Sequence, residues 1–198
     1  MPWLHAVEYL EKIQEIPLND KKLVQISLYA ALIAAMGLVP PIPFATGIPI
    51  TLQTLGVMLA GVMLGPWRGF LAVMLFVFVV ALGLPVLSGG RGGLGVFAGP
   101  TAGFILGFPV AALVTGLVAQ LLGKLNLLVA ASIGAFVGGI LVLYLFGITG
   151  FKLITGREWM ESITIMMVYM PGDLVKVIAT ALIAQSVYRA MPSAVAIR

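Results

Sequence analysis

The sequence contains no cysteine and only one histidine, His5, which lies in the polar N-terminal stretch. The absence of cysteine excludes disulfide bonds and thiolate metal sites. Because the one histidine precedes the first apolar run, a histidine-based catalytic triad or metal cluster inside the apolar part of the chain is also excluded. We therefore expect neither an enzyme nor a resident cofactor or metal ion.

Charged residues are also scarce, at 9% of the 198 residues, whereas a soluble domain carries about 25%. With 61% hydrophobic residues, this composition predicts an integral membrane protein in a lipid bilayer. The basic residues stand mostly singly between apolar runs, as they do in membrane loops, so we do not expect binding to nucleic acid. The first 22 residues contain four acidic residues and no apolar core, so they do not resemble a secretory signal peptide.

Six apolar runs predict an all-α fold with six transmembrane helices, each of which needs about 17–25 residues to cross a bilayer. The runs are about Leu23–Val39, Ile50–Leu64, Gly69–Leu84, Thr101–Leu122, Leu125–Phe146 and Pro171–Met191. The second and third are short, so we expect flanking loop residues at membrane depth, covered by protein or lining a cavity. Residues 162–169 are apolar but too few to cross; we expect them at the interface, with a kinked extension of the sixth span as the alternative.

The basic residues also predict the orientation of the chain. With the N-terminus in the cytoplasm, seven of the eleven Lys and Arg fall in inside segments, three fall in outside loops and Lys176 lies in the sixth span. The positive-inside rule then places both termini in the cytoplasm. Residues 1–22 become a cytoplasmic or interfacial arm, 23–191 the substrate-binding membrane domain and 192–198 a cytoplasmic tail. The outside loops are 40–49, 85–100 and 147–169, and the sixth span begins on their side.

Two charged residues, Asp173 and Lys176, lie within the sixth apolar run. A spacing of three residues puts them on one face of a helix, and Pro171 suits the first turn of that helix. A charge inside a membrane span costs about 2.5–3.5 kcal/mol, so each needs a partner or a function. The pair is either an internal ion pair that joins two helices or the polar floor of a ligand site, and we favour the ligand site.

Other polar and small residues have two interpretations. Gln53, at the start of the second span, can bind a ligand or make an interhelical hydrogen bond. Arg91, in a glycine-rich loop, can hold a carboxylate or extend to the lipid headgroups. The first span contains two overlapping pairs of small residues that can pack a partner or the rest of the bundle, and their members are Ala30, Ala31, Ala34 and Ala35.

Several blocks, taken together and in order, resemble the BioY family, the biotin-specific S components of energy-coupling-factor (ECF) vitamin transporters. They are Pro41-x-Pro43-Phe44, Ile48-Pro49-Ile50-Thr51-Leu52-Gln53-Thr54-Leu55, Gly61-x3-Gly65-Pro66, Gly83-Leu84-Pro85-Val86, Gly92-Gly93-Leu94-Gly95, Gly99-Pro100-Thr101-x-Gly103-Phe104 with Gly107-Phe108, and Pro171-Gly172-Asp173-x2-Lys176. Two positions and one segment depart from the family pattern: Gly47 replaces an expected proline, Phe104 replaces a frequent tyrosine, and residues 76–82 contain no polar side chain.

The resemblance implies an outward-facing biotin pocket beneath the first and third outside loops of a six-helix bundle in a prokaryotic cell membrane. It also implies two kinds of partner, a coupling membrane subunit and a pair of ATP-binding-cassette ATPases. In such S components the alanine ridge of the first helix docks on the coupling subunit. Rival interpretations are an S component for another small vitamin and a biotin carrier that works alone.

Biotin has a ureido group, an apolar ring and chain, and a carboxylate. Under this resemblance Asp173 accepts a hydrogen bond from a ureido N–H, and Lys176 donates to the ureido carbonyl or the carboxylate, or keeps Asp173 ionised. Arg91 is a candidate for the carboxylate. The remaining candidate binding residues are Gln53, Thr51 and Thr101, together with Phe44, Phe97 and Tyr169 as cover for the apolar ring.

Overall fold

The computed structural model describes residues 20–42 and 48–197, and over these residues the fold is all-α. The helices are α2 (Asp20–Met36), α3 (Gln53–Leu64), α4 (Pro66–Ala81), η1 (Leu94–Ala98), α5 (Ala102–Leu121), α6 (Leu127–Phe136), η2 (Val137–Val142), α7 (Leu143–Thr155), α8 (Trp159–Met167), α9 (Met170–Ala190) and η3 (Pro192–Ala194). The described ranges contain no strand, and the Ile42–Ile50 and Leu87–Arg91 contacts are isolated antiparallel bridges. The prediction of an all-α fold is confirmed.

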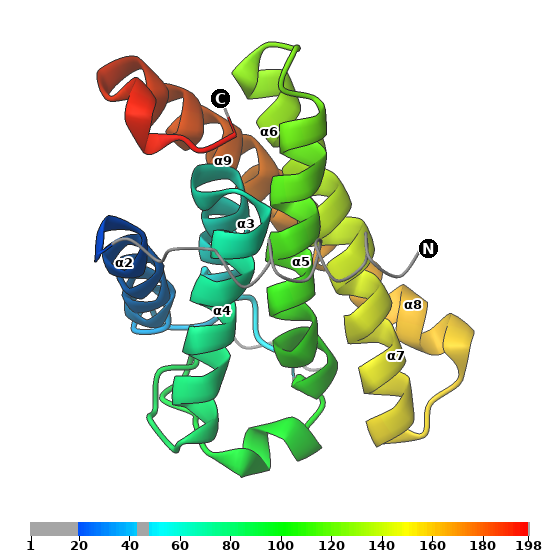
Figure 1. Cartoon of the computed structure of the whole chain (residues 1–198). Coiled ribbons are helices and arrows are strands. Elements are labelled where there is room, and N and C mark those ends of the chain that lie inside the picture. Colours follow the sequence, from blue (N-terminus) through cyan, green and yellow to red (C-terminus); the bar gives the residue numbers. More distant parts are fainter. Residues whose placement is uncertain (1–19, 43–47, 198) are drawn as a thin grey trace, which may run out of the picture.

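Helix α5 occupies the centre of the bundle and packs against α3, α4, α6 and α7 (Figure 1). Glycine makes this packing possible, because a Cβ on Gly116 would lie 2.6 Å from the backbone nitrogen of Pro66. A Cβ on Gly134 of α6 would likewise lie 2.6 Å from the carbonyl oxygen of Thr115 on α5. The helices therefore approach each other closely enough for backbone contact, as small residues allow in membrane bundles.

The helix boundaries follow local chemistry. Helix α4 starts with Pro66, whose missing N–H leaves no bond unmade in a first turn, directly after Gly65 at φ 78°. Asn126 caps α6 by accepting a hydrogen bond of 2.9 Å from the backbone N–H of Leu128. Gly156 ends α7 in the left-handed conformation, which glycine adopts without steric cost. These short turns hold antiparallel helices side by side.

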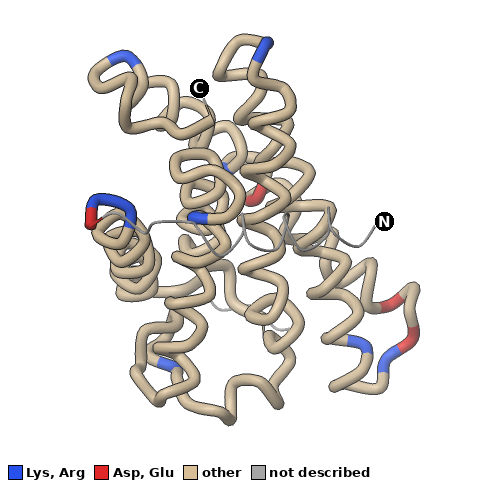
Figure 2. The backbone as a smooth tube through the Cα atoms, in the orientation of Figure 1, with Lys and Arg blue, Asp and Glu red and all other residues tan. Residues whose placement is uncertain are grey.

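Three helical segments are long and apolar enough to cross a membrane, namely Ala102–Leu121, Leu127–Thr155 and Met170–Ala190. The α3 and α4 helices are shorter apolar helices, and the 12 residues of α3 extend only about 18 Å against a hydrocarbon core of about 30 Å. Figure 2 shows that charged residues gather at helix ends and in connecting segments, apart from one acidic–basic pair within the bundle. The chain is therefore a multi-pass membrane protein.

One predicted boundary is wrong. The fifth span does not end at Phe146 but continues through α7 to Thr155, so the loop that follows starts at Gly156. Gly147 and Gly150 fall in the predicted loop 147–169, yet both lie in α7 and bring it against α5, where a Cβ on Gly150 would be 2.5 Å from the Cα of Gly103. Residues 159–167 form the separate helix α8 of nine residues, rather than an extension of the last span, and α9 starts at Met170.

The segment after α9, expected as a tail, packs against the bundle. Val195 and Ile197 are buried in a hydrophobic cluster with residues of α3, α5, α6 and α9. The backbone N–H of Ala196 donates a hydrogen bond of 2.9 Å to the carbonyl of Met63 at the end of α3. This segment therefore closes the end of the bundle that carries the α3–α4 and α5–α6 turns (Figure 1).

Candidate functional site

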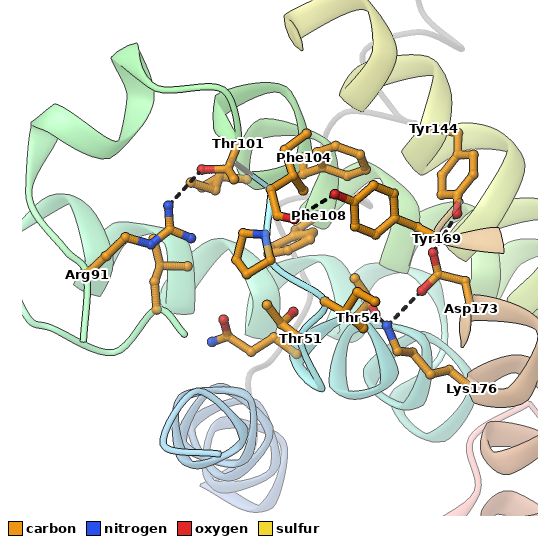
Figure 3. Close-up of a pocket in the computed structure, with 16 residues that line it drawn as sticks. Thr51, Thr54, Arg91, Thr101, Phe104, Phe108, Tyr144, Tyr169, Asp173 and Lys176 are labelled. Atoms are coloured by element: carbon orange, nitrogen blue, oxygen red, sulfur yellow. Dashed lines mark hydrogen bonds and ion pairs between the residues drawn. The ribbon is translucent and has the colours of Figure 1, made fainter. Parts of the chain in front are cut away.

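A cavity lies between α3, α5, α7 and α9 at the end of the bundle that carries the long loops (Figure 3). The empty space inside the cavity and its open mouth is about 630 Å³. The lining residues are Ile48, Pro49, Ile50, Thr51, Gln53, Thr54, Leu87, Arg91, Thr101, Phe104, Ile105, Phe108, Tyr144, Tyr169, Asp173 and Lys176. Most are apolar or aromatic, and the charged ones lie in two separate polar groups.

The first polar group surrounds the buried carboxylate of Asp173. Its Oδ1 lies 2.7 Å from Nζ of Lys176 on the same helix, and its Oδ2 accepts a hydrogen bond of 2.7 Å from the hydroxyl of Tyr144 on α7. Lys176 also donates to the hydroxyl of Thr54 on α3 at 2.9 Å. The charge pair that sequence analysis placed on one helix face therefore joins three helices (Figure 3).

This group retains capacity for a ligand. A carboxylate offers about four lone-pair sites, and the protein occupies one on each oxygen of Asp173. The ammonium group of Lys176 has three N–H donors, of which Asp173 and Thr54 accept two. One donor and two acceptor sites remain beside each other, and a group that both donates and accepts hydrogen bonds fits them.

The second polar group contains Arg91 and Thr101. Arg91 donates from Nη1 to the hydroxyl of Thr101 at 3.3 Å and from Nε to the carbonyl of Ser88 at 3.2 Å. Burial lowers the pKa of the Arg91 guanidinium from its ordinary value, because desolvation disfavours the charge. Among the described residues no acidic side chain forms an ion pair with Arg91, so an anionic ligand group would offset the desolvation.

The two polar groups lie at opposite sides of the cavity, with Arg91 facing Asp173 across it (Figure 3). The aromatic side chains of Phe104 and Phe108 on α5 form the wall between them. A ligand with a hydrogen-bonding head, an apolar middle and an anionic end matches this order of groups.

Gln53 lines the cavity but its amide serves the protein. Its Nε2 donates to the carbonyls of Ile33 at 3.2 Å and Val86 at 3.0 Å, and its Oε1 accepts from the N–H of Ser88 at 3.0 Å. Both amide hydrogens are thus used to tie α2 and the 82–93 loop to the start of α3. Of the two interpretations left open for Gln53, the structure favours the structural one.

Seven of the nine predicted binding residues line the cavity, and they are Thr51, Gln53, Arg91, Thr101, Tyr169, Asp173 and Lys176. Phe97 does not line it; it lies on η1 and packs against a hydrophobic cluster that includes residues of α2, α3, α4 and α5. Phe44 lies outside the described residues. Tyr169 lines the cavity with its ring, while its hydroxyl donates to the carbonyl of Ile48 at 2.7 Å.

Sequence analysis missed the aromatic wall and Tyr144. Phe108 was noted only as part of a family block, and Phe104 only as a departure from one. Tyr144 had no signal in the sequence, because it is one aromatic residue in a long apolar run and its partner Asp173 follows 29 positions later.

The four alanines of the first span do not share one environment. Ala30 is 7% exposed and belongs to the hydrophobic core, and Ala34 packs against the same core. Ala31 and Ala35 are exposed on the outer face of α2, in line with the exposed Ser27 four residues earlier. Of these four alanines, only Ala31 and Ala35 are therefore available to a partner.

Comparison with known proteins points in one direction. A sequence model of the BioY family matches residues 11–193. The chain is 50% identical over 189 residues to a protein named biotin transporter BioY from Rhodobacter capsulatus, covering 90% of this chain and 99% of that protein. It is 44% identical over 181 residues to one of the same name from Rhizobium etli, covering 88% and 97%. The fold matches a crystal structure at 2.1 Å of the S-component for biotin from an ECF-type ABC transporter, with a TM-score of 0.81 and 28% identity over 85% of this chain and 91% of that chain.

Proposed function

The chain belongs to the BioY family, and from this premise we propose that it is a biotin-specific S component that captures the vitamin in the cavity between α3, α5, α7 and α9. The observation that carries this proposal is the order of groups along the cavity. A charge pair with free donor and acceptor capacity lies at one side, and a half-buried arginine that forms no ion pair among the described residues lies at the other. Proteins of this family that are similar over most of the chain are named biotin transporters.

The functional groups of biotin suggest how it lies in the cavity. The ureido group has two N–H donors and one carbonyl, so an N–H donates to Asp173 while the carbonyl accepts the third N–H of Lys176. The apolar ring and chain lie against Phe104 and Phe108. The carboxylate lies beside the Arg91 guanidinium, whose fork of N–H donors suits a carboxylate. One ureido N–H, the ureido carbonyl and the carboxylate then each have a partner, as buried polar groups require.

The topology we propose has six spans, with both termini in the cytoplasm and the cavity open to the outside. The spans are α2, α3, α4, α5, the continuous α6–α7 segment and α9. The positive-inside distribution of Lys and Arg supports this orientation. The cell membrane of a prokaryote is the location that the family membership favours.

Transport requires partners in this proposal. A coupling membrane subunit docks on the face of α2 that exposes Ala31 and Ala35, where small side chains allow close helix contact. A pair of ATP-binding-cassette ATPases supplies the energy through that subunit. The chain itself contains no Walker-type Gly-Lys-Ser/Thr ending.

Binding of radiolabelled biotin to the purified protein tests the proposal. We expect Asp173→Asn to weaken binding at least tenfold, about 1.4 kcal/mol, while the protein still folds. The matched control is Glu161→Gln, which makes the same acid-to-amide change in an exposed ion pair with Arg157 outside the cavity. Wild-type affinity in Asp173→Asn would remove Asp173 from the site.

Two alternatives have their own outcomes. A thermal-shift screen of small vitamins that finds stabilisation by another vitamin and not by biotin would change the substrate but keep the fold. Biotin uptake by cells that lack the coupling subunit and the ATPases would show a carrier that works alone.

A further inference from the structure

One membrane span of this protein is not a regular α-helix. Between α6 and α7 the six residues Val137–Val142 form a π-helix, with hydrogen bonds from residue i to i+5. Such segments are rare inside α-helices and occur frequently at functional sites. The extra residue in the turn rotates everything after it by about 100° relative to an uninterrupted helix.

Close packing holds the π segment in place. A Cβ on Gly138 would lie 2.5 Å from the carbonyl oxygen of Ala111 on α5, and one on Gly139 would lie 2.6 Å from Cγ of Met58 on α3. The backbone contact at Gly138 leaves no room for a side chain, whereas a Cβ on Gly139 would require the Met58 side chain to move. The π segment is therefore wedged between α5 and α3 rather than being a loose turn.

The second residue after the π segment is Tyr144. Its side chain is 5% exposed, and its ring meets the ring of Phe104 edge to face, with centroids 6.4 Å apart and an interplanar angle of 86°. Buried packing of this kind fixes the ring and therefore the position of its hydroxyl. That hydroxyl donates to Oδ2 of Asp173 at 2.7 Å.

Asp173 is held by two donors from different helices. Lys176 binds Oδ1 but belongs to α9 itself and is a long flexible side chain, so it does not fix the plane of the carboxylate. Tyr144 reaches Oδ2 from α7, across the cavity wall, and restricts rotation of the carboxylate about its terminal torsion. The remaining lone pairs of Asp173 then point in defined directions.

We propose that Tyr144, placed by the π segment, is a positioning residue that orients the Asp173 carboxylate toward a ureido N–H of the ligand. This proposal rests on the proposed function, because the ureido group belongs to biotin. Tyr144 acts through Asp173: its effect is to select ligands that present an N–H donor at this point.

The test compares Tyr144→Phe with the wild type in binding biotin and two analogues, each methylated on one ureido nitrogen. The phenylalanine ring keeps the packing against Phe104 and removes only the hydroxyl. We expect biotin affinity to fall about tenfold. The wild type should bind biotin more tightly than at least one methylated analogue. In Tyr144→Phe we expect this affinity ratio to fall at least threefold, because a misaligned acceptor no longer distinguishes N–H from N–CH3. Tyr188→Phe, at the far end of α9, is the matched control and retains both values.

The outcomes separate this proposal from the one on which it rests. Absence of biotin binding in the wild type would defeat the proposed function. Biotin binding in the wild type with unchanged affinity in Tyr144→Phe would defeat the role of Tyr144 alone. Equal weakening of biotin and both methylated analogues would show that Tyr144 only supports the fold, and would also overturn the proposal.

Discussion

Gly103 of α5 and Gly150 of α7 lie backbone to backbone, so a Cβ added to Gly150 would be 2.5 Å from the Cα of Gly103. This contact joins two helices at the end of the bundle that holds the cavity, where Phe104 follows Gly103 directly. Neither backbone can move without separating α5 from α7. The aromatic wall of the cavity therefore depends on two residues that have no side chain.

We predict that Gly150→Ala lowers the free energy of unfolding by about 1–3 kcal/mol, the usual cost of overpacking a tight contact. Thermal unfolding in detergent measures the change. Gly172→Ala is the control, since a Cβ there would meet nothing within 4 Å and alanine favours a helix. Equal stability of Gly150→Ala and wild type would mean that α5 and α7 do not approach as described.

A second prediction concerns the amide of Gln53. In Gln53→Glu the side chain keeps its shape but loses the two N–H donors that bind the carbonyls of Ile33 and Val86. Unsatisfied buried polar groups cost about 1–3 kcal/mol each, so we expect a loss of stability of at least that size without ligand. Gln120→Glu, the same change at an exposed position of α5, should leave the unfolding temperature unchanged within error.

A third prediction assigns the anionic end of the ligand to Arg91. We expect Arg91→Gln to weaken biotin binding about tenfold or more, because a hydrogen bond to a charged group contributes about 1.5–3 kcal/mol. Binding of biotin methyl ester, which lacks the negative charge, should change less than threefold in the same variant. Arg157→Gln, which removes an exposed arginine paired with Glu161, serves as the control. A similar loss for acid and ester would place the carboxylate elsewhere.

A fourth prediction compares the exposed alanine Ala31 of α2 with the buried alanine Ala30. Ala31→Leu adds bulk to the exposed face and should prevent assembly with the coupling subunit while biotin binding remains. Ala30→Leu adds the same bulk within the core and should lower stability by about 1–3 kcal/mol. Co-purification and thermal unfolding distinguish the two effects. Normal assembly of Ala31→Leu would exclude this face as the docking surface.

Local spacing was enough to predict part of the site. Asp173 and Lys176 are three residues apart in an apolar helix, and that alone places them on one face and predicts their pairing. The partners that complete the cluster, Tyr144 and Thr54, lie 29 and 122 positions away from the residues they bind. Contacts at such separations depend on how helices pack, which local spacing does not specify.

Other predictions were wrong or left two interpretations open for related reasons. Glycines such as Gly147 and Gly150 occur both in loops and at close contacts between helices, so the predicted end of the fifth span was wrong. The amide of Gln53 binds backbone carbonyls, which every residue possesses, and the sequence therefore cannot show its partners. Ala30 and Ala31 differ only in which neighbour covers them, and this depends on the rotation of α2 about its axis.

The π segment contains one residue more than a regular helix of the same length would need. Deleting a single residue between Val137 and Val142 would leave the span continuous and apolar, so insertion into a bilayer would not suffer. The same deletion would rotate Tyr144 away from Asp173. A one-codon loss at this point would thus leave a protein that reaches the membrane but selects its vitamin poorly.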